Sequence, residues 1–230
     1  MLFFAEWGSE KNLFHNPVEE GYDYLLCFDY RTLDFDYTLI EGYTEIRLLA
    51  WSIGVWVASR VFTGHSFPWR MKLAVNGTPF PIDDRRGIPE MIFKGTLEHF
   101  SEDTLTRFRR RMCGSARQTE EFLSHTPTRT AEELREELAA LALGITAYGS
   151  SSFIWDRAII GNRDKIFPPR NQHEAWQGTE IMETEAEHYE TSLFRRLLEG
   201  EGEEWTRHGY DNDLRKRPTA TTDKPECKNT

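Results

Sequence analysis

Apolar and polar residues alternate along the first part of the chain. Apolar side chains, many of them aromatic, fall on every second position in residues 22–30, and the same period returns in residues 33–39. A period of two is typical of strands with one buried face. The Arg31-Thr32 link between the two runs is short enough for a hairpin turn, or it forms a bulge in one long strand.

Residues 44–62 are rich in apolar side chains whose spacing fits either a buried helix or a buried strand. Gly54 divides the run. We therefore expect a short helix up to about Ser52, followed by a strand that continues through Val61.

Residues 69–82 have the pattern of a hairpin. Asn76-Gly77 is a pair that readily adopts the positive φ values of a two-residue turn. Pro79 and Pro81 lack the backbone N–H that a ladder needs, so we expect the return strand at an edge of the sheet.

The second half of the chain predicts helices. Residues 101–112 follow Ser101, a favourable N-cap. Residues 131–148 follow a capping box made by Thr130 and Glu133, and their leucines recur at helical spacing.

Residues 153–167 predict a return to strand because they contain short apolar runs. Residues 172–198 predict a last helix that carries an acidic stripe, consisting of Glu180, Glu183, Glu187 and Glu190. Residues 200–230 are polar, and we expect them to form a partly disordered tail.

Strands thus precede helices, the order typical of an α+β fold. We expect a mainly antiparallel, aromatic-rich sheet from the N-terminal half, covered by helices from the C-terminal half. At 230 residues, the chain is expected to form a single domain over residues 1–199.

The charge is unevenly distributed. The formal net charge is −10, yet residues 60–170 hold 17 basic and 14 acidic side chains. Aromatic residues make up 13% of the chain, which argues against general disorder. The three widely spaced cysteines predict neither a disulfide framework nor a zinc site. With no signal peptide or membrane span expected, we predict a cytoplasmic protein.

Arginines on the predicted helix 101–112 are the strongest candidate for a binding surface, because guanidinium groups suit phosphates and carboxylates. This candidate surface comprises Arg107, Arg110 and Arg111, extended by Arg117, Arg85 and Arg86. Trp69 is a candidate for stacking on an unpaired base. The alternative is that the acidic stripe neutralises these arginines inside the fold.

The segment Asp34-Phe35-Asp36-Tyr37-Thr38-Leu39 resembles the first motif of the haloacid-dehalogenase phosphatases, D-x-D-x-T. The resemblance implies that Asp34 attacks phosphorus and that Asp36 is the acid or base, with magnesium holding the phosphate. Val55–Ser59 resembles the strand that ends in the family's phosphate-binding residue. The alternative is that both aspartates lie on the solvent face of a strand.

Other chemistry is incomplete in the sequence. Glu185 and His188 form one E-x-x-H, but a di-iron bundle needs two. Gly64-His65-Ser66 lacks the second glycine of a nucleophile elbow. We therefore expect no metal, no cofactor and no catalytic residue outside the phosphatase resemblance.

Three functions remain open. The favoured one is a non-catalytic binding subunit of a macromolecular assembly that contacts nucleic-acid phosphates or an acidic protein partner through its basic middle. The second is a divergent phosphatase that uses Asp34 and Asp36. The third is an acidic inhibitor or immunity-type protein that binds a basic enzyme.

Overall fold

A parallel sheet forms the centre of the molecule. The computed structural model describes residues 1–14, 21–125, 128–200 and 202–206. Its strands lie in the order β2-β1-β3-β4-β5-β6, and every neighbouring pair is parallel. They are β1 (Leu2–Phe4), β2 (Leu25–Cys27), β3 (Ile46–Trp51), β4 (Trp69–Val75), β5 (Arg157–Gly161) and β6 (Glu180–Thr184). The prediction of a mainly antiparallel α+β sheet is therefore wrong.

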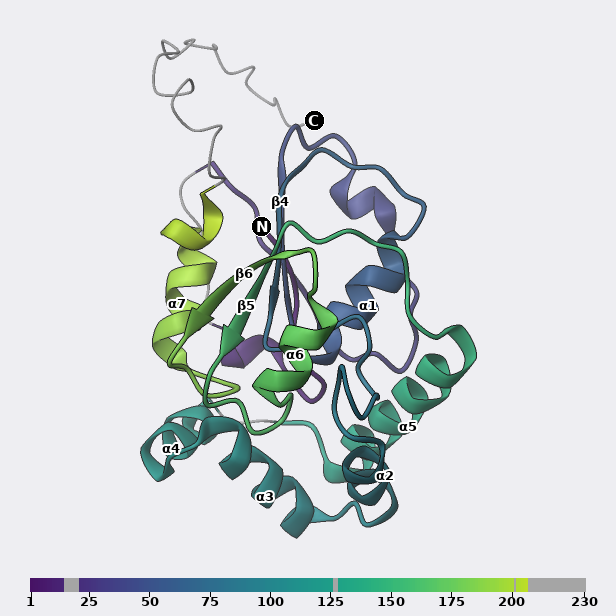
Figure 1. Cartoon of the computed structure of the whole chain (residues 1–230), viewed down its shortest axis with the longest axis vertical. Helices are drawn as coiled ribbons and strands as arrows, with labels where there is room; N and C mark the ends of the chain where they lie inside the picture. Colours follow the sequence, from purple (N-terminus) through teal and green to yellow (C-terminus); the bar gives the residue numbers. More distant parts are fainter. Residues whose placement is uncertain (15–20, 126–127, 201, 207–230) are drawn as a thin grey trace, which may run out of the picture.

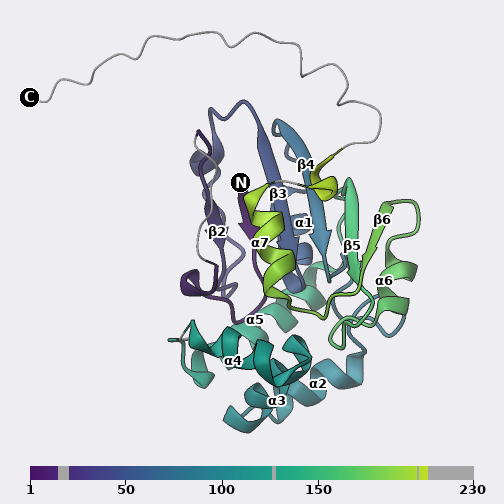
Figure 2. The same ribbon diagram turned by 90° about the vertical axis from the view of Figure 1, so that its left-hand side faces the viewer.

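Helices cover both faces and one end of this sheet. They are α1 (Ile53–Phe62), α2 (Glu90–Glu98), α3 (Glu102–Cys113), α4 (Ala116–Ser124), α5 (Ala131–Tyr148), α6 (Pro169–Ala175) and α7 (Thr191–Glu199). Helix α7 lies on one face and α1 on the other (Figure 1). Helices α2 to α5 follow β4 in the chain, and α2 to α4 lie beyond the carboxyl ends of the strands (Figure 2). We call helices α2 to α5 the lid.

The alternating N-terminal pattern misled the prediction of the sheet. Only Leu25–Cys27 of the run 22–30 is a strand, at the sheet edge, and residues 33–39 contain none. In that loop, the rings of Phe35 and Tyr37 lie 5.3 and 6.3 Å from the ring of Phe62 on α1. The alternation there reflects loop aromatics packed on a helix. The central strand β3 is instead apolar on both faces, as buried parallel strands are.

Residues 44–62 have the reverse of the predicted order, because strand β3 comes first and helix α1 follows. The predicted hairpin 69–82 is also absent. Asn76 has the expected positive φ of 45°. However, the chain leaves the sheet after β4 and continues towards the lid.

The two helices with clear N-caps are confirmed. The Ser101 side chain accepts the backbone N–H of Thr104 at the start of α3, and the capping box of Thr130 and Glu133 begins α5. In the predicted segment 153–167, the strand is limited to β5. The predicted helix 172–198 is wrong, because its residues form the end of α6, strand β6 and helix α7.

The described part of the predicted tail packs on the domain. A short 3-10 helix, η3 (Glu203–Trp205), buries Trp205, and the buried Arg157 guanidinium donates to the carbonyl oxygens of Glu203 and Glu204. Residues 207–230 lie outside the described residues. No helix in the described ranges combines the length and the apolar character needed to cross a bilayer.

Candidate active site

Ser52 occupies the sharp turn between β3 and α1. Its backbone has φ 59° and ψ −129°, a strained conformation for a residue with a side chain. The turn is tight because α1 begins against the end of β1. A Cβ at Gly54 would collide with the carbonyl oxygens of Phe4 and Ala5. The segment Ala50-Trp51-Ser52-Ile53-Gly54 is thus a strand–serine–helix turn of the nucleophile-elbow type, with alanine at the first small position.

His188 and Asp164 complete a chain of hydrogen bonds from Ser52. The Nε2 atom of His188 lies 3.1 Å from Ser52 Oγ, and its Nδ1 atom lies 2.9 Å from Asp164 Oδ2. Asp164 follows β5 and His188 follows β6, so all three residues lie at the carboxyl ends of parallel strands. The carboxylate of Asp164 is held by further donors: the backbone N–H groups of Ile166 and Phe167 and the amide of Gln172.

The loop that carries His188 is fixed from two neighbouring strand ends. The carbonyl oxygen of His188 accepts hydrogen bonds from Trp51 Nε1 and from Asn76 Nδ2, both at 3.0 Å. A Cβ at Gly77 would collide with the backbone of Ser52. Asn76-Gly77, the predicted hairpin turn, therefore supports the site instead of joining two strands.

A second carboxylate touches the same histidine. Glu6 lies on the loop after β1, is 2% exposed, and places its Oε1 atom 3.1 Å from His188 Nε2. Complete burial by itself lowers the pKa of His188. The charges of Asp164 and Glu6 and their hydrogen bonds outweigh this effect and raise the pKa to about 10.

A small, mainly apolar cavity lies next to the Ser52 turn, between the loops that follow the strands and the lid. Its volume is about 40 Å³. Its lining is mainly apolar and includes Trp7, Ile53, Phe93, Phe108, Leu138 and Ile166, together with Glu6 and Arg111. The volume suits only a few waters.

The predicted arginine surface is divided between the lid and a loop. Arg107, Arg110 and Arg111 are exposed on α3, Arg117 is exposed on α4, and Arg85 and Arg86 lie on the loop after β4. Arg85 pairs with Glu174 at 2.7 Å, and Arg86 pairs with Asp83 at 2.9 Å. Trp69 is separated from the lid, because it begins β4 at the opposite end of the strand.

The predicted acidic stripe does not exist as a helix face. Glu180 and Glu183 lie on β6, Glu187 lies in the following loop, and Glu190 caps α7. Glu180 and Glu187 form ion pairs with Arg157 and Lys165, and Glu183 Oε1 lies 3.4 Å from Nε2 of His173. Among the described residues, no ion pair joins an arginine of α3 to one of these glutamates. The alternative that the acidic stripe neutralises the arginines is therefore not found there.

The aspartates of the phosphatase resemblance lie on the surface. Asp34 and Asp36 are exposed, and Asp36 caps a 3-10 helix, η2 (Tyr37–Ile40), by accepting the backbone N–H of Thr38 at 3.0 Å. The prediction that they form a catalytic pair is wrong, because both are exposed, Asp36 caps a turn, and neither takes part in the buried hydrogen bonds around Ser52.

Sequence reasoning missed all three residues of the hydrogen-bond chain. Ser52 carried a signal, namely a small residue two positions before it and Gly54 two positions after it, behind an apolar run. His188 was considered only as a metal ligand on a helix, whereas it is completely buried in a loop. Asp164 carried no local signal.

Comparisons with known proteins agree with this geometry. The family model described as "Pimeloyl-ACP methyl esterase BioG" matches residues 1–199. A "Malonyl-[acyl-carrier protein] O-methyltransferase" of Bacteroides fragilis is 46% identical over 200 residues, covering 86% of this chain but 41% of that protein. The chain thus spans less than half of that relative.

Solved structures are similar to this chain as well. The crystal structure of BioG from Haemophilus influenzae has a TM-score of 0.79 and 41% identity, covering 86% of this chain and 91% of that one. A carboxylesterase structure from Nitrososphaera gargenis has a TM-score of 0.52 at 13% identity, with 86% and 87% covered. These likenesses show an α/β-hydrolase-like fold.

These findings correct the functional predictions. A non-catalytic binding subunit, a nucleic-acid-binding protein, a haloacid-dehalogenase-like phosphatase and an acidic inhibitor are all wrong, because the family match covers residues 1–199 with an enzyme family.

Proposed function

Because this chain belongs to the BioG family of pimeloyl-ACP methyl esterases, we propose that it hydrolyses the methyl ester of an acyl group carried by an acyl carrier protein. The observation that carries the proposal is the chain of hydrogen bonds from Ser52 through His188 to Asp164. The order Ser, Asp, His along the sequence is that of α/β-hydrolase triads.

Each residue of the triad has a defined role in the proposed reaction. Nε2 of His188 takes the proton of Ser52 Oγ as the oxygen attacks the ester carbonyl, and it returns that proton to the departing methanol. A water molecule, deprotonated by the same nitrogen, then releases the free carboxylate from Ser52. Asp164 holds Nδ1–H, so that Nε2 faces Ser52.

The oxyanion of this reaction needs backbone donors. The N–H of Ile53 directly follows Ser52 at the N-terminus of α1, the position that supplies one donor in this class of hydrolase. A second donor comes from the loop after a neighbouring strand in such enzymes. Here that loop follows β1 and contains Trp7. The loop is held in place because Trp7 Nε1 donates a hydrogen bond to the carbonyl oxygen of Leu134 on α5 at 2.8 Å.

The cavity beside Ser52 holds only a few waters, so an acyl chain enters it only if the lid moves. The apolar side chains that line it would then favour a long acyl group over a short one. Each buried methylene contributes about 0.8 kcal/mol, and a pimeloyl group has several more methylenes than a malonyl group. With carrier-bound methyl esters of both acids as substrates, we expect kcat/KM to favour pimeloyl by about 100-fold. Release of methanol and of the free carboxylate is the readout.

Hydrolysis removes the methyl group that a methyltransferase adds. Methyl transfer is the activity named for the B. fragilis relative. Ser52, His188 and Asp164 suit hydrolysis. Transfer of a methyl group to malonyl-carrier protein by the full chain, without ester hydrolysis, would contradict the proposal.

The lid arginines are proposed to contact the carrier protein. We expect the triple variant Arg107→Ala, Arg110→Ala, Arg117→Ala to raise KM for a carrier-bound ester about tenfold, with kcat nearly unchanged. Hydrolysis of a small free ester should be unaffected. The control is Arg135→Ala on α5, which removes an exposed lid arginine paired with Glu132. Equal effects on free and carrier-bound esters would refute this contact.

We also propose that the reaction takes place in the cytoplasm. The described cysteines, Cys27 and Cys113, are free thiols, which is compatible with a reducing compartment.

A further inference from the structure

Glu6 is a titratable residue beside the reacting atoms, and it has no role in the triad. Its Oε1 atom lies 3.0 Å from Ser52 Oγ and 3.1 Å from His188 Nε2. Ser52 Oγ itself lies 3.1 Å from the same nitrogen. The three atoms therefore form a nearly equilateral triangle, and each is within hydrogen-bond reach of the other two.

Glu6 Oε1 occupies a position that ester hydrolysis needs for another oxygen. During the reaction, the departing alcohol oxygen, and later the attacking water, must lie within hydrogen-bond reach of the histidine nitrogen and beside Ser52 Oγ. Glu6 Oε1 satisfies both conditions in the structure. An ester therefore takes its reactive position only after this carboxylate has moved.

The charges at the site lead to the same conclusion. A carboxylate on each ring nitrogen favours the imidazolium form of His188. An imidazolium cannot take the proton of Ser52. Without the contact from Glu6, Asp164 alone would face the ring, as in an ordinary triad.

Other titratable groups surround the cluster. Burial raises the pKa of Cys113 on α3 and of Tyr30 on the loop after β2, and the nearby charge of Glu6 raises the pKa of each further. Arg111 on α3 lines the same cavity as Glu6. Rotation of the Glu6 side chain into that cavity would carry the carboxylate away from His188 and into the space bordered by a guanidinium group.

We propose that Glu6 is a positioning residue that occupies the leaving-oxygen site in the resting enzyme and keeps His188 protonated until an ester displaces it. It thereby sets the pH range over which Ser52 is nucleophilic. This role rests on the proposed function only in requiring Ser52 to be the nucleophile.

The test uses an organophosphate, diethyl 4-nitrophenyl phosphate, with the full chain. Ser52 Oγ forms the bond to phosphorus, 4-nitrophenolate leaves, and the serine proton passes to His188 Nε2. The second-order rate constant is measured from mildly acidic to alkaline pH for the unmutated protein, Glu6→Gln and Glu6→Ala. Glu90→Gln is the control, because Glu90 is an exposed lid carboxylate in the first turn of α2.

The acidic limb of each profile reports the protonation of His188 in the free enzyme. We expect Glu6→Gln to move this limb towards acid by about one pH unit or more. Glu6→Ala should also raise the rate at neutral pH about tenfold or more, because it also removes the obstructing group. Glu90→Gln should follow the unmutated protein.

Two outcomes overturn the inference in different ways. Phosphorylation with an unmoved limb, or with slower reaction in both Glu6 variants, overturns the role of Glu6 and leaves the esterase proposal intact. No phosphorylation in any variant overturns the assignment of Ser52 as the nucleophile, and with it the proposed triad mechanism and this inference.

If the Glu6 variants do not fold, NMR of the unmutated protein still tests the inference. An imidazolium between two carboxylates keeps both ring N–H protons of His188 in the NMR spectrum through neutral pH. Loss of either proton at neutral pH would overturn the inference.

Discussion

Replacing Ser52 by alanine should lower kcat/KM for the carrier-bound methyl ester by about 10⁴-fold or more. The loss is this large because the variant has no oxygen to form the acyl-enzyme, and only binding and oxyanion stabilisation remain. Replacing His188 by alanine should have a similar effect. The double variant should be no worse than either single one, because the effects of residues that act as a unit are not additive. Steady-state kinetics on purified, folded variants measure these losses.

Ser66 provides the matched control. It lies in Gly64-His65-Ser66, the other serine-containing segment that suggested a nucleophile, and it is exposed. Ser66→Ala should retain full activity. An active Ser52→Ala variant would rule out the triad, whatever the effect at Ser66.

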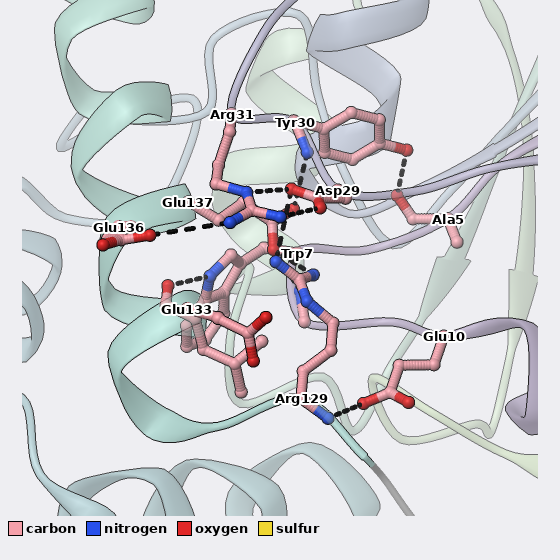
Figure 3. A network of polar contacts seen from close by, with 12 residues as sticks. Ala5, Trp7, Glu10, Asp29, Tyr30, Arg31, Arg129, Glu133, Glu136 and Glu137 are labelled. Atoms are coloured by element: carbon pink, nitrogen blue, oxygen red, sulfur yellow. Dashed lines mark hydrogen bonds and ion pairs between the residues drawn. The ribbon is translucent and has the colours of Figure 1, made fainter.

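Replacing Glu137 by alanine should lower the free energy of unfolding by about 3–5 kcal/mol. Glu137 lies on α5 with a fully buried side chain, and its carboxylate accepts Arg129 Nη1 at 2.6 Å and the Tyr30 backbone N–H at 2.9 Å (Figure 3). Within the part of the chain that the structure describes, the substitution leaves a nearly buried guanidinium with only the more distant Asp29, at 3.3 Å, as its ion-pair partner. Urea unfolding followed by tryptophan fluorescence measures the change.

The neighbouring Glu136 is the control that separates the effect of burial from the effect of charge. It lies on the same helix, but its side chain is 54% exposed and its pair with Arg31 spans 3.5 Å (Figure 3). Glu136→Ala should change stability by at most about 1 kcal/mol. Equal losses for the two variants would contradict the assignment of Glu137 as the buried anchor.

The same anchor connects stability to the active site. Glu137 also accepts the backbone N–H of Gly8 at 3.4 Å, so α5 holds the loop that carries Glu6 and Trp7. The lid thus fixes the residues on one side of Ser52, and we expect Glu137→Ala to lose activity along with stability.

Local features were predictable from the sequence, and distant pairings were not. Helices α3 and α5 were found because their caps and apolar stripes lie within a few residues of each other. The sheet was missed because a parallel strand such as β1 is a three-residue apolar run whose partners lie far along the chain. Its pairing leaves no period in the local sequence.

The active site follows the same rule. The small residue, serine and glycine around Ser52 form a local pattern that could have been recognised. His188 is separated from Asp164 by 24 positions and from Ser52 by 136. Only the parallel order of β3, β5 and β6 brings the three together, so an incorrect sheet concealed the triad.

Mapping of an organophosphate adduct tests the catalytic role of Ser52 most directly. The full chain is treated with diethyl 4-nitrophenyl phosphate, and the modified peptide is identified by mass spectrometry. One diethylphosphoryl group is expected, located on Ser52 and absent from Ser52→Ala. An adduct on another residue, or none on a protein that hydrolyses the carrier-bound ester, would contradict it.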